Sequence, residues 1–368
     1  MDHSLTNRQQ QVLRATVDHY IATAEPVGSQ ALAREYQLSI SPATIRNVMG
    51  VLEDAGLLFQ PHTSAGRIPS DSGYRLYVDQ LMMPPETLIT QVKQALYRRL
   101  RTESWIFEVL LRETAQILAT LSGCVALITL PQTATATIRH LHVARVEPQR
   151  VMFILVTDAY ETQSVVMELP HSIWDEDDPD RIEQELKILS NFLNHHFQGC
   201  SLQALVALDP NELDREFDQY AEFLKILLSD LTQRYQALTP KNILVGGLAE
   251  VLRQPEFSEL QQVQTLIHLL EDGQDLLWPL IHEWASTNEK SVLSTAPGDR
   301  KKVNVRIGSE NLLESIHAYT LISATYQKGT TPIGSVGILG PTRMAYEKVI
   351  ALVSVTADYL SNCLAQAA

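Results

Sequence analysis

One segment, SPATIRNVMGVLEDAGLLFQPHTSAGRIPS, which begins at Ser41 and ends at Ser70, constrains the fold more than any other part of the chain. Ser41 can cap a helix through its hydroxyl, and Pro42 suits the first helical position, where the backbone N–H has no partner. Gly56 stands where the end of a helix favours a left-handed residue. A short apolar strand, a polar turn and a return strand follow. The segment therefore predicts a helix followed by a β-wing.

Two more helices are expected before this segment, at Leu5 to Thr23 and at Gln30 to Tyr36. Glu25-Pro26 separates them, because proline cannot continue a helix and restricts the residue before it. Three helices and a hairpin in about eighty residues are the pattern of a winged helix-turn-helix. A small three-helix bundle with no role at DNA remains the alternative at this point.

The predicted helix of the opening segment has two distinct faces, since each residue turns it by about 100°. Ile45, Met49 and Leu52 recur at helical spacing and are expected to face the core. The opposite face carries small and polar residues, among which asparagine suits adenine and arginine suits guanine or phosphate. We expect DNA contacts from this face and from the turn, namely from Ser41, Ala43, Thr44, Arg46, Asn47, Gly50, His62, Thr63, Ser64 and Arg67.

The charge of the chain limits how DNA could be held. The formal net charge is −14, and the residues before Met83 carry six arginines against eight carboxylates. A general nucleic-acid binder with a broad positive field is therefore excluded. Binding must depend on the placement of a few arginines and helix N-termini, with a small non-specific affinity.

The rest of the chain predicts an α+β domain with a helical insertion. At 368 residues the chain is long for one core, and Met82-Met83-Pro84-Pro85 marks a first boundary. A helix over Thr87 to Leu121, with a possible break near residues 102–104, is expected to connect to a sheet. Period-two patterns predict strands at Cys124 to Leu130, Arg139 to Arg145, Val151 to Val156, Thr162 to Leu169, Val303 to Ile307, Ala318 to Tyr326 and Gly334 to Leu339.

Helical patterns interrupt this sheet and then end the chain. They lie at Asp180 to Phe197, Pro210 to Leu238, Glu256 to Leu270 and Met344 to Ala365, and the segments Asn242 to Leu248 and Leu276 to Trp284 are left without an assigned type. A sheet that is interrupted by helices and resumed is typical of one α+β domain with an insertion, and an exposed helical pair is a candidate for dimerisation. The predicted domains are 1–83 for DNA binding, 84–122 as a connecting helix, 123–170 with 239–368 as the α+β domain, and 171–238 as the inserted dimerisation domain.

Catalytic, metal and membrane functions find little support. The glycine-rich stretch that starts at Gly334 lacks the strand–GxGxxG–helix context and a Walker lysine. The histidine pairs 140/142 and 195/196 have no third ligand at metal spacing. Three distant cysteines indicate a reducing compartment, and no signal peptide, lipidation pattern or membrane-length apolar run is present. We expect a cytoplasmic protein that is no enzyme and that has no cofactor, no metal and no membrane association.

Longer phrases carry a family resemblance. They are YIATAEPVGSQALA, the opening segment extended through DSGYRLYVDQLM, NILVGGLAEVLRQPEFSE, IGSENLLESIHAYTLISATY and GSVGILGPTRMAYEKVIALV. Together they resemble the HrcA family of bacterial heat-inducible transcription repressors, most specifically in PHTSAGR and GPTRM. The agreement is weakest from Pro170 to Leu238. Ser70 stands where the family pattern has threonine, and Val48 stands where an acidic residue is usual.

The resemblance implies a winged-helix domain, a GAF-like domain and an inserted dimerisation domain. It implies a homodimer that binds an inverted-repeat operator in double-stranded DNA upstream of chaperonin and chaperone genes. It further implies that the chaperonin keeps the repressor active until heat-unfolded clients occupy it. A regulator that senses a small ligand through the GAF-like sheet is the alternative, which would need convergent polar groups where the strands read as largely apolar. An enzyme with an accessory DNA-binding domain and a pure interaction protein are weaker alternatives.

Overall fold

The chain forms two compact units, Met1–Leu130 with Lys241–Ala368 and Pro131–Pro240, in a computed structural model. The described residues are 5–36, 38–63, 65–82, 86–99, 107–131, 137–147, 150–157, 162–168, 179–200, 243–258, 260–271, 273–282, 292–294, 302–329 and 331–366. The expected α+β mixture of helices and strands is confirmed, and the strands pair in an antiparallel manner.

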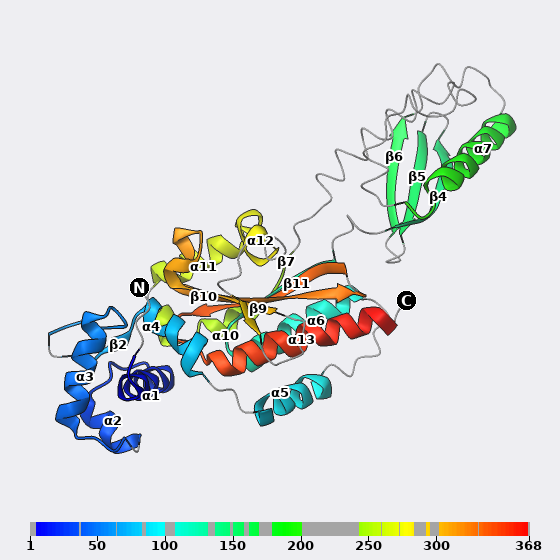
Figure 1. The fold of residues 1–368 in the computed structure, drawn as a ribbon. Coiled ribbons are helices and arrows are strands. Elements are labelled where there is room, and N and C mark those ends of the chain that lie inside the picture. Colours follow the sequence, from blue (N-terminus) through cyan, green and yellow to red (C-terminus); the bar gives the residue numbers. More distant parts are fainter. Residues whose placement is uncertain are drawn as a thin grey trace. The chain divides into compact units, whose positions relative to one another are not determined.

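The first unit begins with a segment that we call the N-terminal module, residues 5–82. Three helices and a two-stranded hairpin occupy the expected ranges. A further short helix continues into a single π-helical turn (Figure 1). The elements are α1 (Asn7–Thr23), α2 (Ser29–Glu35), α3 (Pro42–Asp54), β1 (Leu58–Phe59), β2 (Ile68–Pro69), α4 (Asp71–Leu76) and the π turn Tyr77–Leu81.

The rest of the first unit, which we call the sheet module, is built on a six-stranded antiparallel sheet in the order β7-β3-β11-β10-β9-β8. The short strand β8 was not expected from the sequence. The strands are β3 (Val125–Thr129), β7 (Ile243–Gly246), β8 (Val292–Ser294), β9 (Lys302–Ile307), β10 (Tyr319–Lys328) and β11 (Thr331–Pro341).

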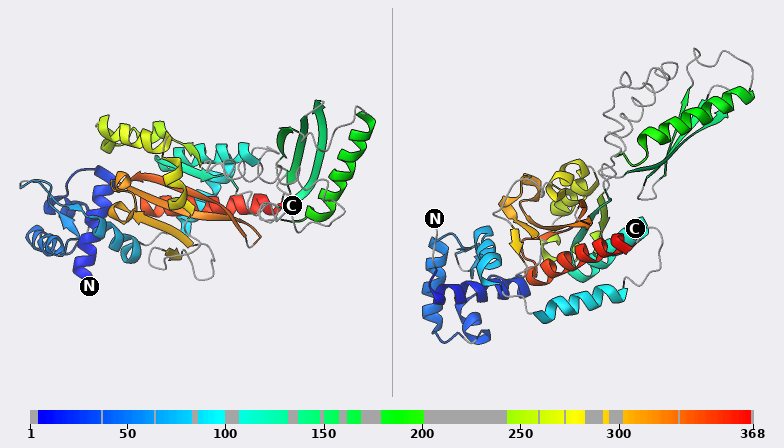
Figure 2. Two further views of the ribbon diagram at one scale, coloured as in Figure 1. Left: turned by 90° about the horizontal axis from the view of Figure 1, so that it is seen from above. Right: turned by 45° about the vertical axis from the view of Figure 1, so that its right-hand side comes forward.

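Helices cover both faces of this sheet (Figures 1 and 2). On one face lie α6 (Phe107–Ser122) and α13 (Tyr346–Gln366), with α5 (Glu86–Arg99) packed against α13. On the other lie α10 (Leu248–Val251), the 3-10 turn Pro255–Ser258, α11 (Leu260–Glu271) and α12 (Gln274–His282). Two further 3-10 turns, Gly308–Glu310 and Glu314–Ile316, connect β9 to β10.

The segment expected as one connecting helix is two helices, α5 and α6, and residues 100–106 between them lie outside the described part. Both helices pack into the core of the sheet module, so they are structural rather than a free connector. Among the described helices, α13 is long and apolar enough to cross a membrane, but 56% of its apolar window is buried within the unit. The amphipathic pattern of α13 is thus accounted for by its packing on β10.

The second unit corrects the expectation of a single sheet. Strands β4 (Ile138–Glu147), β5 (Arg150–Thr157) and β6 (Thr162–Glu168) form their own three-stranded antiparallel sheet, and only β3 joins the larger one. The insertion therefore starts at Pro131 instead of near residue 171, and its described part contains a sheet as well as a helix. The physical reason is that period-two patterning specifies the two faces of a strand but not its neighbours. The helix expected at 210–238 lies outside the described residues.

Helix α7 (Pro179–Phe197) closes one side of this small sheet. Its Asn194 side chain accepts from the Leu141 N–H at 2.8 Å and donates to the Leu141 carbonyl at 2.6 Å. Ser190 Oγ accepts from the Val143 N–H at 2.9 Å. Polar side chains of α7 thereby satisfy backbone groups of β4 on the edge that no described strand pairs, which is one way in which proteins protect a sheet edge.

Candidate DNA-binding surface

Helix α3 has the two faces that its sequence predicts. Ile45, Met49 and Leu52 are buried in the core of the N-terminal module. On the opposite face Ala43, Arg46 and Asn47 are exposed, while Thr44 and Gly50 are half-buried. A side chain added at Gly50 would meet no atom within 4 Å, so the backbone there is open to close approach.

One residue of this face was missed by the sequence reasoning. Val51 follows Asn47 by four positions, which places both on the same side of the helix, and it is 50% exposed. An apolar side chain on a DNA-reading helix can contact the methyl group of thymine. Its i+4 spacing from Asn47 was the available signal.

The start of α3 is capped as predicted. Ser41 Oγ accepts from the Thr44 N–H at 3.2 Å, and the two side-chain hydroxyls lie 2.9 Å apart. Pro42 occupies the first helical turn. Ser41 and Thr44 thus hold the helix N-terminus in place, while Ser41 stays exposed at its end.

Three local features stabilise the hairpin after α3. The Val27 N–H donates to the Arg67 carbonyl and the Arg67 N–H donates to the Val27 carbonyl, both at 2.9 Å, so an isolated β-bridge ties the α1–α2 loop to the hairpin. A Cβ at Gly66 would collide with the Val27 carbonyl, which explains glycine there. Gln60 Nε2 donates to the carbonyls of Thr63 and Ala65 at 3.0 and 2.8 Å. The side chain of Gln60 therefore braces the turn from inside.

Two of the predicted contact residues, His62 and Thr63, are exposed near the tip of the turn. Ser64, also predicted, lies outside the described residues. The hairpin thus presents polar side chains to solvent from a braced turn.

Arg67 is bound to α3, which the sequence did not reveal. Its Nε donates to Glu53 Oε2 at 2.8 Å, and the two side chains are 23% and 32% exposed. This ion pair joins the last turn of α3 to the β1–β2 hairpin. It also occupies one donor of Arg67 and leaves Arg46 as the exposed cation of the helix.

The N-terminal module is bonded to the sheet module through α4. Arg75 donates to both carboxylate oxygens of Glu310, at 2.8 and 2.5 Å, and to the Val305 carbonyl at 2.5 Å. Asp71 Oδ2 accepts from the Ser309 N–H and hydroxyl, each at 2.9 Å. Burial lowers the pKa of Arg75, but the hydrogen bonds and charge of Glu310 outweigh this and raise it overall. The arginine is therefore a fixed positive charge that holds the two modules together.

A second arginine makes the same connection from the other side. Arg343 Nη1 donates to the Ile21 carbonyl in the last turn of α1 at 2.7 Å, and its Nε donates to Glu256 at 2.6 Å. Burial lowers the pKa of Arg343, whereas the Glu256 carboxylate raises it more, so the net shift is upward. A cation at this position satisfies a carbonyl that the helix itself leaves unpaired.

Aromatic rings fill the space between these ion pairs. The rings of Tyr74 and Tyr346 lie 5.6 Å apart between centroids, and Tyr77 lies 6.5 Å from Tyr346. Tyr346 Oη donates to the Thr342 carbonyl at 2.6 Å, and burial raises the pKa of Tyr346. The contact between the two modules is thus a packed and hydrogen-bonded interface.

The histidine pairs lie in the second unit. The rings of His140 and His142 are stacked at 6.4 Å, and His195 lies edge-on to His196 at 5.3 Å. Among the described residues, no group of three or more His, Cys, Asp or Glu side chains could hold a metal ion.

Comparison with known proteins places the chain in a family. Residues 108–350 match the HrcA protein C terminal domain. The chain is 78% identical to the heat-inducible transcription repressor HrcA of Acaryochloris marina (strain MBIC 11017) and 59% identical to that of Cyanothece sp. (strain PCC 7425 / ATCC 29141), over the full length of both chains in each case. A hypothetical protein solved at 2.2 Å shares the fold, with a TM-score of 0.60 and 23% identity over 99% of this chain and 100% of that one. The chain therefore belongs to the HrcA family of heat-inducible transcription repressors, which are regulators and not enzymes.

Proposed function

We propose that the chain acts in the cytoplasm as a homodimer that binds an inverted-repeat operator of chaperonin and chaperone genes. The N-terminal module is the winged helix-turn-helix, α3 is its recognition helix and the β1–β2 hairpin is its wing. The observation that carries the proposal is the division of α3 into a buried apolar face and an exposed face with Arg46, Asn47 and Val51. A two-fold dimer would place one such helix on each half-site.

The contacts follow from side-chain chemistry. Asn47 suits a paired hydrogen bond with adenine, and Arg46 suits guanine or a phosphate. Ala43 and Gly50 leave room for the backbone of the helix to approach the groove. Because the chain carries a net charge of −14, these few contacts must supply most of the affinity.

Regulation by heat uses the folding state of the repressor. In this proposal the GAF-like sheet module and the insertion need the chaperonin to reach the active dimer, and repression lapses when heat-unfolded clients occupy the chaperonin. Proteins are stable by only about 5–15 kcal/mol, so a modest rise in temperature is enough to shift the active population.

The insertion supplies the dimer contact in this proposal. Thr129 at the end of β3 pairs directly with Ile243 at the start of β7. The two ends of the insertion therefore leave the sheet from neighbouring antiparallel strands. Such ends can be joined by a two-residue turn, which makes the insertion removable without cutting the sheet.

A gel shift with an inverted-repeat duplex from a chaperonin operator tests the reading face. Asn47→Ala and Arg46→Ala are each expected to weaken binding by about 1–3 kcal/mol. Arg112→Ala on α6, where the side chain is 69% exposed, removes the same charge away from the DNA and serves as the matched control. Unchanged binding in both α3 variants would reject this face. Addition of chaperonin should increase the fraction of active repressor.

Excision of the insertion tests the dimer contact. Residues 130–242 are replaced by Asn-Gly, and circular dichroism confirms that the remaining unit is folded. Light scattering should then report monomers. A persistent dimer would show that the sheet module or the N-terminal module makes the contact.

A further inference from the structure

One face of the six-stranded sheet changes character along its length. Near β3 and β7 this face is apolar and packs under α11 and α12, through residues that include Leu127, Leu321 and Leu339. Toward β9 and the far ends of β10 and β11 the same face is polar. The side chains there are Asn304, Arg306, Ser323, Thr325 and Ser335.

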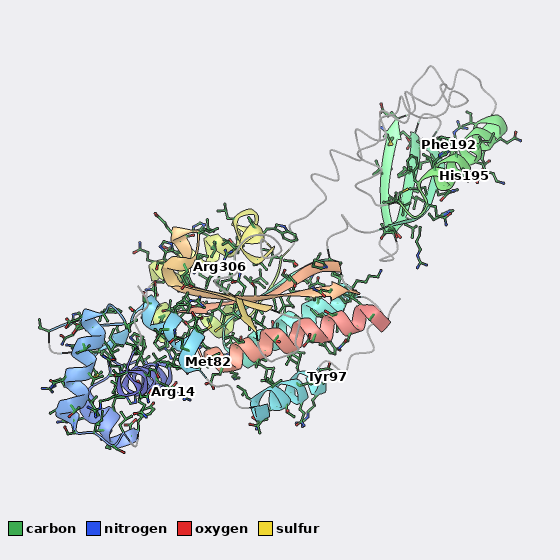
Figure 3. The ribbon with its side chains drawn as sticks, viewed as in Figure 1. Arg14, Met82, Tyr97, Phe192, His195 and Arg306 are labelled. Carbon is green, nitrogen blue, oxygen red and sulfur yellow. The ribbon has the colours of Figure 1, made fainter. Side chains whose placement is uncertain are left out.

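Strand register shows that these polar side chains share one face. Asn304 pairs with Ser323, and Thr325 pairs with Ser335, as direct antiparallel partners. Direct partners in an antiparallel pair place their Cβ atoms on the same side, about 4.5–5.5 Å apart. Arg306 follows Asn304 by two positions and shares its face, on the side of the sheet where α11 lies (Figure 3). The alternating residues of β9 point into the opposite core.

The residues of β10 and β11 in this polar area are small. Ser323 has Gly337 as its other cross-strand partner, so no side chain stands there. A Cβ built on Gly337 would meet no atom nearer than 3.6 Å. Small residues of β10 and β11 thus lie beside Asn304 and Arg306 of β9, and together these side chains form a polar floor next to the apolar half of the face.

Three atoms on this floor are buried without a hydrogen-bond partner. They are Asn304 Oδ1, Ser335 Oγ and Arg306 Nη1, and the residues Asn304 and Ser335 are only 3% and 0% exposed. Folded proteins pair nearly all buried polar atoms, and an exception calls for a bound water, ion or ligand. Two of these atoms lie on β9 and one on β11, on one face of the sheet with only β10 between the two strands, and a single occupant above β10 would give all three a partner.

The chemistry of these atoms indicates which class of ligand would fit. A guanidinium group presents a planar fork that matches a carboxylate or a phosphate, and amide and hydroxyl groups complete the coordination of such an oxyanion. Leu321, which pairs with Arg306, offers apolar contact next to the charge. We propose that the sheet module binds a small molecule bearing a carboxylate or phosphate group on the floor formed by Asn304, Arg306, Ser323 and Ser335.

Strand β9 connects this site to the N-terminal module. Its Val305 carbonyl, between Asn304 and Arg306, accepts from Arg75 of α4. The N–H of Ile307 donates to Glu310 at 2.8 Å, the same carboxylate that holds Arg75. The proposed ligand binds to one face of β9, and Arg75 of the N-terminal module is hydrogen-bonded to the same strand. Ligand binding that orders β9 therefore also orders this contact between the two modules.

Isothermal titration calorimetry of the full-length chain tests the site without using DNA, so its result is independent of the proposed operator binding. The probes are inorganic phosphate, propionate and benzoate. Saturable binding of phosphate alone identifies a phosphate site, and binding of either acid identifies an organic carboxylate site. Absence of saturable binding with all three probes overturns the proposal.

Variants separate this site from non-specific anion binding. Arg306→Met should lower the affinity for the probe by about tenfold or more, since a charged hydrogen-bond partner is lost. The matched control Arg112→Met should leave the affinity for the probe unchanged. Where Arg306→Met fails to fold, Arg306→Lys keeps the charge but lacks the fork and should still weaken binding. Equal binding in the wild type and in the folded Arg306 variant overturns the proposal.

Ser335→Ala distinguishes a ligand site from a purely structural water. Removing a hydroxyl that has no partner should leave the urea midpoint of the ligand-free chain unchanged or higher, and it should weaken probe binding. A structural water would give the opposite pattern, a lower midpoint with unchanged probe binding, and that result would overturn the assignment.

Discussion

The guanidinium of Arg75 and the carboxylate of Glu310, 235 positions apart in the chain, are joined by hydrogen bonds of 2.8 and 2.5 Å. Glu310 belongs to the phrase IGSEN, and Arg343, which binds the end of α1, belongs to GPTRM. The distant phrases that carry the family resemblance are therefore segments that bond the N-terminal module to the sheet module. Their recurrence as a set has a physical cause in this shared interface.

Arg75→Met should lower the free energy of unfolding by about 1–3 kcal/mol, because Glu310 and the Val305 carbonyl both lose a charged donor. Urea denaturation measures this change. In a double-mutant cycle, Arg75→Met with Glu310→Gln should cost less than the sum of the single variants. Arg253→Met, which removes a 75% exposed arginine paired with Glu250, is the control and should cost less than about 0.5 kcal/mol. Additive costs in the cycle would show that the pair is not coupled.

Arg343→Met should loosen the end of α1, since the Ile21 carbonyl loses its donor and Glu256 loses its partner. Hydrogen exchange of the amides in the last turn of α1 should speed up, while exchange at the start of α1, capped by Thr6 and Gln9, should change little. Uniform acceleration along the whole helix would indicate global destabilisation instead of loss of a local contact.

Glu53→Gln should strengthen DNA binding and steepen its dependence on salt. The substitution removes a negative charge next to the proposed DNA-binding face and frees Arg67 Nε, so that about one more phosphate can be neutralised. Gel shifts at several salt concentrations measure the slope of affinity against salt. Asp54→Asn, on the next residue of the helix, removes the same charge without breaking the ion pair. An equal slope in the two variants would contradict a specific role for Arg67.

Tyr77→Phe should destabilise the chain by about 1 kcal/mol at neutral pH, because Tyr77 Oη donates to Asp18 at 2.7 Å. Burial raises the pKa of Asp18, and the hydrogen bond from Tyr77 and the charge of Arg14 lower it only in part. A folded-state pKa above the unfolded value means that ionisation opposes folding, so stability falls as the pH rises through that folded value. Losing Tyr77 raises the pKa of Asp18 further.

The cost of Tyr77→Phe should therefore shrink as Asp18 becomes protonated. Urea denaturation at neutral pH and at about pH 5 checks the sign. A cost that grows on acidification would rule out this account of the Asp18 carboxyl.

Cys124 should resist alkylation in the folded chain. Burial raises the pKa of its thiol to about 12, whereas Cys200 and Cys363 are only half-buried. Because the thiolate is the reactive form, iodoacetamide at about pH 8 should modify Cys200 first and Cys124 last. Mass spectrometry after timed quenching gives the order, and unfolding in urea should equalise the three rates.

The local part of the candidate site was predictable from sequence. The cap at Ser41, the buried and exposed faces of α3 and the left-handed Gly56 depend on neighbours within a few positions, and the structure has all three. Val51 belongs to the same local pattern and could have been found from it. The ion pair of Arg67 could not be predicted. Its partner Glu53 lies 14 positions away, and the two meet only because the hairpin folds back on the helix.

The sequence by itself determined the elements whose causes are local, such as the helices, the hairpin, most strands and the faces that they bury. Tertiary structure alone decided which strands share a sheet, so that β4 to β6 separated from β3, and which distant side chains meet, as Arg75 does with Glu310. The reason is that periodicity encodes the direction of a side chain relative to its own backbone. The partner of a strand or of a charge depends on the packing of whole elements, which no short window of sequence contains.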